Sequence, residues 1–235
     1  MRIGIIGAMA SEVDNLIARM EDTTQHTYAG RQFVCGRLAG KDAVVVQSGI
    51  GKVAAAITTQ MLVDRFGTDI LLNTGMAGGL DSRLAVKDLV IATAALQHDF
   101  DLTAFGHVRG FLYGEDDTRP TLFPTDTDLV ERALTAAGQV LPVGSKAITG
   151  LVASGDIFVD DSGLKATLRD TFGAAAAEME GAAIAQTAVS NGIPFVILRT
   201  ISDLAEQQAH VSFDEMERYA GQLAGDITVA LLSAL

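Results

Sequence analysis

Two carboxylates, Glu178 and Glu180, flank Met179 inside a run (residues 174–185) that otherwise holds only Ala, Gly and Ile. Burying an unpaired carboxylate is costly or raises its pKa, so such residues need a physical reason. One interpretation places the acids at a helix start, where the helix dipole favours them. The other is a carboxylate in a dry pocket that accepts hydrogen bonds from a substrate diol, with Met179 as the apolar surface beneath it. The stretch alone leaves both interpretations open.

Two further acids follow apolar runs that are typical of buried strands. Glu12 comes shortly after Arg2–Gly7, and Asp203 comes after residues 195–198, preceded by Arg199 and Ser202. A first-turn acid, a helix cap or a surface ion pair is the plain interpretation of each. A carboxyl in a partly desolvated site can instead exchange a proton near neutral pH, which is the chemistry of a general acid or base.

Glycine-rich stretches at residues 75–79 and 48–52 predict either tight turns or loops whose N–H groups approach an anion or a polar base. Neither has the spacing of a dinucleotide fingerprint or of a P-loop. Phe158 follows Ser154-Gly155-Asp156. Its ring could belong to the core, or it could offer a flat surface to a heteroaromatic ring.

The elements that must position these residues alternate between apolar strands and amphipathic helices. Strands are predicted at residues 2–7, 32–38, 43–47, 69–73, 89–95, 147–153, 174–179 and 194–200, with a hairpin joining the second to the third. Helices are predicted from a cap at Ser11 to Met20 and at residues 53–61, 126–138, 161–172, 181–191 and 212–235, and residues 98–124 predict a long irregular loop.

This alternation predicts an α/β fold in one domain, residues 1–235, with a central mixed, mostly parallel twisted sheet covered by helices on both faces. Ligands in such folds bind at the carboxyl ends of strands. The acids and glycine-rich stretches named above follow strand ends, so we expect them to gather at one edge of the sheet.

Composition excludes several function classes. The formal net charge of −12 argues against a nucleic-acid partner. Cys35 is the only cysteine, which excludes an intrachain disulfide, and the four scattered histidines give no zinc spacing, so we expect no metal and a reducing cytoplasm. No run reaches the length of a membrane helix, so no membrane association is expected. A hydrophobic content of 49% is compatible with a homo-oligomer.

Taken in order, the motifs resemble the 5′-methylthioadenosine/S-adenosylhomocysteine nucleosidases of the nucleoside phosphorylase/hydrolase superfamily. The matching stretches are residues 3–9 with Glu12, 48–56, 73–75 with 77–79, 103–106, 154–156 with Phe158, 178–180, 201–203 and 212–215. They cover nearly the whole chain. No single stretch is decisive, but their joint occurrence is specific.

The resemblance implies hydrolysis of the bond between adenine and a 5′-thio-substituted ribose, without metal or cofactor. It implies that Asp203 donates a proton toward N7 of adenine, that Glu12 orients and deprotonates the attacking water, and that Glu180 holds the ribose hydroxyls. The substrate-binding residues that it implies are Met9, Ile50, Ala77, Gly78, Leu102, Phe105, Phe158, Val159, Glu178, Met179, Glu180, Arg199, Ser202 and Phe213.

The resemblance also implies a homodimer in which Phe105 reaches the neighbouring subunit's site. Two features depart from the family pattern: Met76 stands where a small hydroxyl residue is common, and residues 111–121 do not match, which leaves the 5′-substituent open. The alternatives are a 6-amino-6-deoxyfutalosine hydrolase, a purine nucleoside phosphorylase and a catalytically silent nucleoside-binding module.

Overall fold

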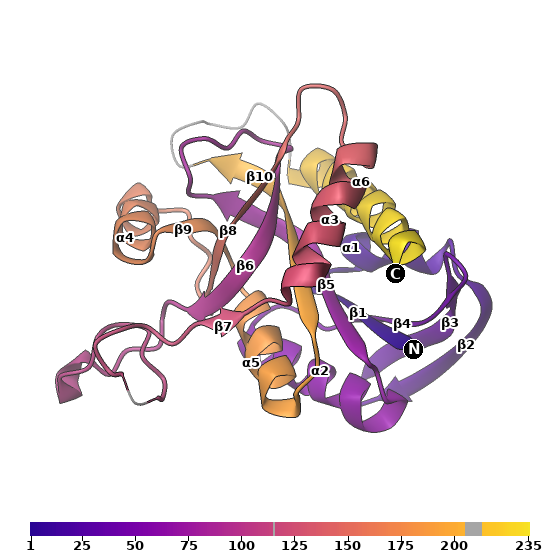
Figure 1. Ribbon diagram of the computed structural model, residues 1–235, viewed down its shortest axis with the longest axis horizontal. Helices are drawn as coiled ribbons and strands as arrows, with labels where there is room; N and C mark the ends of the chain where they lie inside the picture. Colours follow the sequence, from indigo (N-terminus) through magenta and orange to yellow (C-terminus); the bar gives the residue numbers. More distant parts are fainter. Residues whose placement is uncertain (115, 205–212) are drawn as a thin grey trace.

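The structure is a computed structural model that describes residues 1–114, 116–204 and 213–235, except for the side chains of Leu204, Phe213 and Asp214 (Figure 1). Its strands are β1 (Arg2–Gly7), β2 (Glu21–Tyr28), β3 (Arg31–Leu38), β4 (Lys41–Gln47), β5 (Ile70–Gly79), β6 (Leu89–Gln97), β7 (Phe123–Pro124), β8 (Ala147–Ser154), β9 (Ala174–Glu178) and β10 (Phe195–Leu204). Its helices are α1 (Ala10–Ile17), α2 (Lys52–Phe66), the short 3-10 helix η1 (Thr103–Phe105), α3 (Thr127–Val140), α4 (Ser162–Phe172), α5 (Gly181–Asn191) and α6 (Phe213–Ala234).

All the described strands belong to one mixed sheet, with the order β10-β6-β8-β9-β5-β1-β4-β3-β2 and β7 paired to β6. The central strand β1 runs parallel to β4 and β5, whereas β2, β3 and β4 form an antiparallel meander. Because β10 pairs with both β6 and β5, the strands β5, β9, β8, β6 and β10 close into a ring. The mixed sheet confirms the prediction, but its partial closure was not predicted.

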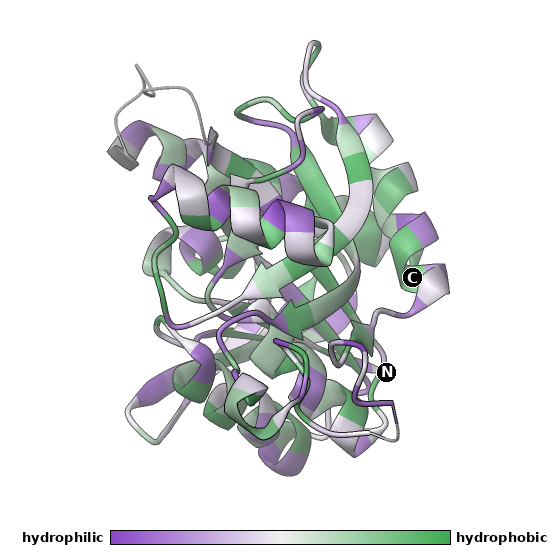
Figure 2. Ribbon diagram, turned by 90° about the vertical axis from the view of Figure 1, so that its left-hand side faces the viewer, coloured by the Kyte–Doolittle hydropathy of each residue, from purple (hydrophilic) through white to green (hydrophobic). Residues whose placement is uncertain are grey.

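Helices cover both faces of this sheet. The apolar sides of α2 and α5 pack into one buried cluster with strand residues, and those of α1, α3 and α6 pack into a second. Helix α4 packs on β9 and stands apart from the other helices (Figure 1). Figure 2 shows the same partition as hydropathy, with hydrophobic residues gathered along the central strands and mixed surfaces on the helices.

The structure corrects one expected turn and one expected helix cap. Residues 75–79 are not a turn but the second half of β5, and none of their glycines has a positive φ. Ser11 is not the cap of α1, since the helix begins after Met9 and the Ser11 hydroxyl donates a hydrogen bond to Glu217 instead. At Gly75 the missing side chain permits the close approach of Glu12, and no change of chain direction is involved.

Other differences concern strand length. Strand β2 was missed, because all eight of its residues are exposed and its sequence is polar, without the alternation that marks a half-buried strand. Strand β10 extends past the predicted end at Thr200 to include Ser202 and Asp203. Residues 98–124 are mostly irregular, as predicted, apart from η1 and β7. The expected helix start at Ser212 lies outside the described residues.

Among the residues that the structure describes, no helix combines the length and apolar character needed to cross a membrane.

Candidate active site

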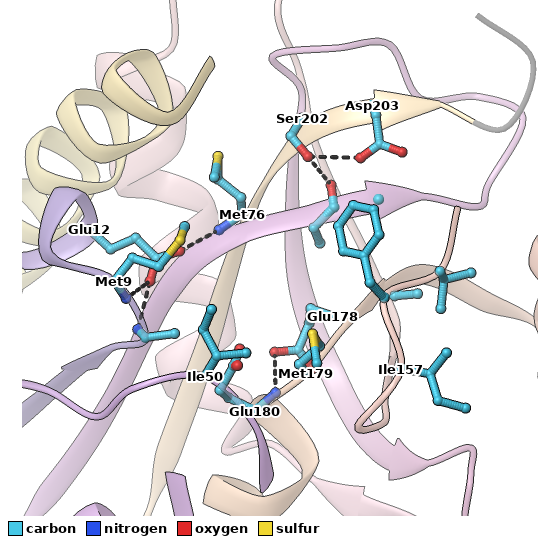
Figure 3. A pocket seen from close by; sticks show the side chains of 16 residues that line it. Met9, Glu12, Ile50, Met76, Ile157, Glu178, Met179, Glu180, Ser202 and Asp203 are labelled. Carbon is cyan, nitrogen blue, oxygen red and sulfur yellow. Dashed lines mark hydrogen bonds between the residues drawn. The ribbon is translucent and has the colours of Figure 1, made fainter. Parts of the chain in front are cut away.

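A cavity of about 180 Å³ opens where β1, β8 and β9 end beside the second halves of β5 and β10 (Figure 3). Its lining residues are Ala8, Met9, Glu12, Ile50, Met76, Ala77, Gly78, Ile157, Phe158, Val159, Ala177, Glu178, Met179, Glu180, Ser202 and Asp203. Thirteen of these were singled out from the sequence. The expected gathering of acids and glycine-rich stretches at one edge of the sheet is therefore observed.

Glu12 projects into the cavity from the first turn of α1. Its Oε2 accepts hydrogen bonds from the backbone N–H groups of Ala8 (2.6 Å) and Met9 (3.0 Å), and its Oε1 accepts one from the Met76 N–H (3.1 Å). Burial raises the pKa of Glu12, against the lowering effect of the Arg199 charge and of these three N–H groups. The result is a fixed carboxyl group whose proton affinity is higher than in water.

Gly75 makes the approach of Glu12 to β5 possible. A Cβ at this position would lie 2.6 Å from Glu12 Oε1 and 3.1 Å from Arg199 Nη1, closer than a side chain permits. Gly75 thus lies in a regular strand, where its missing side chain leaves room for the Glu12 carboxyl group. It is not part of a phosphate-binding loop.

Glu178 lines the cavity, but its carboxylate is already bound to protein groups. It forms a buried ion pair with Arg199, whose Nε lies 3.1 Å from Oε2, and accepts hydrogen bonds from the Ser154 hydroxyl and from the N–H groups of Glu180 and Gly181. Burial acts to raise the pKa of Glu178, but the Arg199 charge and these hydrogen bonds hold it below its ordinary value. This group is an ionised anchor at the start of α5.

Arg199 does not line the cavity. Its side chain is buried behind Glu178 and also donates to Asn73 of β5, so the ion pair is internal rather than on the surface. The charge of Arg199 nevertheless acts on Glu12, Glu178 and Glu180, because all three carboxylates shape its own pKa, which lies above the ordinary value despite burial. One cation thus faces three buried acids.

Glu180 is the N-cap residue of α5, yet its side chain makes no capping hydrogen bond. Its Oε1 accepts one hydrogen bond from the N–H of Gly51 (2.9 Å), in the stretch that precedes α2. Burial and then the charge of Glu178 raise the pKa of Glu180 to about 7. A carboxyl group with free acceptor positions facing the cavity suits a ligand hydroxyl pair.

Asp203 lies on the opposite side of the cavity from Glu180, on β10 (Figure 3). The Ser202 hydroxyl donates to its Oδ1 (2.9 Å), and the ammonium of Lys165 donates to its Oδ2 (2.7 Å). Lys165 was not singled out from the sequence. Its position could have indicated burial, because it lies in α4 three residues before the buried Leu168 and therefore on the buried face of the helix, where an unpaired lysine is unfavourable.

The remaining walls are apolar. Phe158 and Val159 follow β8, and the Phe158 ring is 69% exposed, so it is not part of the core. Met179 and Ile50 lie nearer Glu180, and Met76 lies nearer Glu12 (Figure 3). Ala8, Ile157 and Ala177 were not singled out from the sequence, since small and aliphatic residues next to strand ends carry no chemical signal.

A polar network ties two of these walls together. Asp156 Oδ1 accepts from the backbone N–H of Lys52 (2.8 Å), and the Lys52 ammonium donates to Asp99 Oδ1 (2.6 Å) and to Gln97 Oε1 (3.0 Å). The Asp156 N–H in turn donates to Asp99 Oδ2 (2.9 Å). The stretches that carry Ile50 and Phe158 are thereby held at fixed separation.

Besides Arg199, two expected site residues in the described part of the chain do not line the cavity. Leu102 and Phe105 lie at η1, away from the lining, and Phe105 is 79% exposed. Phe213 begins α6, but its side chain lies outside the described part of the chain.

Comparison with known proteins places the chain in a family. The family described as the phosphorylase superfamily matches residues 2–233. A 5′-methylthioadenosine/S-adenosylhomocysteine nucleosidase of Shewanella halifaxensis is 43% identical over the full length of both chains. The crystal structure of such a nucleosidase from Colwellia psychrerythraea, in complex with adenine, is 42% identical and superposes with a TM-score of 0.91, covering 100% of this chain and 96% of that one.

Futalosine hydrolase of Helicobacter pylori shares the fold as well, with 33% identity, a TM-score of 0.90 and coverage of 100% of this chain and 98% of that one. Full-length identity above 40% to the nucleosidases, together with the superfamily match, decides the assignment. The chain belongs to the 5′-methylthioadenosine/S-adenosylhomocysteine nucleosidase family of the phosphorylase superfamily.

Proposed function

We propose that the protein hydrolyses the N-glycosidic bonds of 5′-methylthioadenosine and S-adenosylhomocysteine, releasing adenine and the 5-thio-substituted ribose. The observation that carries this proposal is the placement of three acids in different environments, Glu12, Glu180 and Asp203, around one cavity whose other walls are mostly apolar. Departure of the purine leaves positive charge on the ribose and negative charge on the base, and catalysis must stabilise both.

Asp203 acts as the general acid in this proposal. It lies on the β10 side of the cavity, whose lining also includes Phe158. An adenine ring stacked on Phe158, with its edge read by the Val159 backbone and its other face toward Ala77 and Gly78, brings N7 toward Asp203. Protonation of N7 turns the purine into a neutral leaving group.

Glu12 acts as the base that activates water. Its carboxyl group is fixed by three N–H groups, and its raised pKa gives it the proton affinity that a base needs. Met76 contributes its N–H to this arrangement, which requires no side-chain hydroxyl at that position. A water molecule held by Glu12 attacks C1 of the ribose, transfers a proton to Glu12 and leaves a hydroxyl on the sugar.

Glu180 binds the ribose 2′ and 3′ hydroxyls, with Met179 packed against the sugar. Glu178 supports it by anchoring the start of α5, with both carboxylate oxygens bound to protein groups. When they are ionised, the three carboxylates Glu12, Glu178 and Glu180 carry more negative charge than the single positive charge of Arg199 neutralises. This excess of negative charge stabilises the cationic sugar of the transition state. No Lys or Arg lines the cavity among the described residues, which favours water over phosphate as the nucleophile.

The 5′-thio group is expected near Met9, at the open side of the cavity. We propose that Leu102 and Phe105 of a second subunit, together with Phe213, complete this subsite in a homodimer. Support comes from apolar side chains left in solvent on α2 and α5, where Val53 is 70%, Ile57 41% and Val189 44% exposed. Light scattering should give twice the chain mass, and a monomer would contradict the dimer.

We place the reaction in the cytoplasm, which suits a chain with a single cysteine, and in the salvage of methionine, because the thioribose product keeps its methylthio group. Cell fractionation and growth on 5′-methylthioadenosine as the sulfur source test these two assignments.

The test of the function is adenine release from 5′-methylthioadenosine, S-adenosylhomocysteine and 6-amino-6-deoxyfutalosine, each with and without phosphate. The proposal requires phosphate-independent release from the first two, with free sugar as product. The third substrate is included because the Helicobacter pylori futalosine hydrolase has the same fold. Formation of a sugar 1-phosphate would indicate a phosphorylase, and no release would indicate a binding module.

A further inference from the structure

Lys165 is a lysine in an unusual place. Its side chain is 5% exposed, and its ammonium lies 2.7 Å from Asp203 Oδ2. Lysine is almost never fully buried unless it is paired with an acid. Among the described residues, Asp203 is the one group that accepts a hydrogen bond from this ammonium. The pair is therefore a specific contact between α4 and β10.

The contact joins the two parts of the cavity that face the purine in the proposed mechanism. Helix α4 begins shortly after Phe158 and Val159, which form the stacking wall, while Asp203 lies on β10 beside Gly78. The Ser202 hydroxyl binds Oδ1 and the Lys165 ammonium binds Oδ2, so both oxygens of Asp203 have a donor. These contacts are those of an ionised carboxylate, the form that Asp203 takes once it has given up its proton.

We propose that Lys165 is a positioning residue for the general acid, an inference that rests on the proposed function. When the glycosidic bond breaks, its electron pair goes to the purine. The Asp203 O–H bond breaks, an N7–H bond forms, and the O–H electron pair stays on Asp203 as a carboxylate. Lys165 orients this carboxyl group and compensates the charge that forms on it. Asp203 regains its proton from solvent after adenine leaves, and Glu12 returns to solvent the proton taken from water.

The proposal is tested with two leaving groups. Adenine needs a proton to depart, whereas the nitrophenolate of a 4-nitrophenyl 5-methylthioriboside departs without one. In Lys165→Met, which keeps an apolar side chain of similar length, kcat for 5′-methylthioadenosine should fall about 10- to 100-fold with KM changed by less than about threefold, the cost expected of a misplaced catalytic group. Hydrolysis of the nitrophenyl substrate should stay within about threefold of wild type.

Two further variants complete the test. Lys165→Arg keeps the charge and should recover at least a tenth of the wild-type kcat. Arg169→Met serves as the matched control. Arg169 lies on the same helix, its exposed side chain pairs with Asp170, and its replacement should leave both reactions unchanged.

The experiment distinguishes failure of the positioning role of Lys165 from failure of the proposed nucleosidase function. Wild-type kcat in Lys165→Met, or an equal loss on both substrates, would overturn the positioning role while leaving the nucleosidase function standing. Failure of the wild-type chain to release adenine would overturn the proposed function and this inference together.

Discussion

Replacing Arg199 with Met should leave the Glu178 carboxylate buried without its counter-charge. Arg199 is 1% exposed and Glu178 is 7% exposed, so solvent cannot take over the role of the guanidinium. Breaking a buried ion pair from one side costs about 3–5 kcal/mol. For a chain of this size, about 2–4 °C of melting temperature is lost per kcal/mol, which gives a decrease of about 6–20 °C.

The free energy of unfolding is measured by urea titration followed by circular dichroism, at pH 7 and at pH 4. The pKa of Glu178 is lowered in the folded state, so the stability that its ionised form contributes is present above its ordinary pKa and is lost as pH falls through the folded value. In Arg199→Met the carboxyl can be protonated at pH 4, where a neutral group needs no counter-charge. The difference between variant and wild type should therefore shrink at pH 4.

Two controls separate the buried charge from other effects. Adding Glu178→Gln to Arg199→Met removes the unpaired charge and should recover at least half of the lost stability. Arg19→Met breaks an ion pair with Asp226 that is partly exposed on both sides, and should cost at most about 1 kcal/mol. A loss below about 1 kcal/mol in Arg199→Met at pH 7 would show that Glu178 does not depend on Arg199 as its counter-charge.

Three further predictions concern the acids around the cavity. Gly75→Ala should displace the Glu12 carboxyl and lower kcat about 100-fold while substrate binding persists; steady-state kinetics with an unchanged rate would contradict the close approach. Asp203→Asn should lower kcat for adenine release by about 100-fold or more and leave binding of an uncleaved analogue intact in calorimetry, and full activity would remove Asp203 as the acid. Glu180 has a raised folded pKa of about 7, so its stabilising contribution is complete below its ordinary pKa of 4.5 and is lost as pH rises through 7. Glu180→Gln should therefore gain up to about 3 kcal/mol relative to wild type between pH 5 and pH 8 in urea titrations, and a constant difference would contradict the raised pKa.

The acids of the cavity could be singled out because they interrupt or follow apolar runs, but these runs alone left a helix cap or an ion pair open, and the family resemblance supplied the expected roles. Glu12, Glu180 and Asp203 each stand where a buried strand ends or a helix begins, and parallel strands bring such positions to one edge. The role of the glycines in β5 was not predictable in the same way. The stretch that contains Gly75 was expected to form either a tight turn or a ligand-approaching loop, because glycine is typical of both, and only the position of Glu12 against the strand explains it.

Contacts between distant residues account for most of what the sequence left open. Arg199 meets Glu178 across 21 positions, and Lys165 meets Asp203 across 38. Neither spacing follows a helix or strand period, so only the assembled sheet determines the partner. The closure of β10 onto β5 is of the same kind, since both strands are apolar and nothing local selects the neighbour. Strand β2 was not predicted, because all its residues are exposed and its polar sequence has no apolar alternation.

The most direct test of the proposed hydrolysis is to identify the products that the purified chain forms from 5′-methylthioadenosine, with and without phosphate, by measuring adenine release and identifying the sugar. We expect adenine and free 5-methylthioribose in both conditions, at rates that phosphate does not change. Release that depends on phosphate, with 5-methylthioribose 1-phosphate as product, would contradict it.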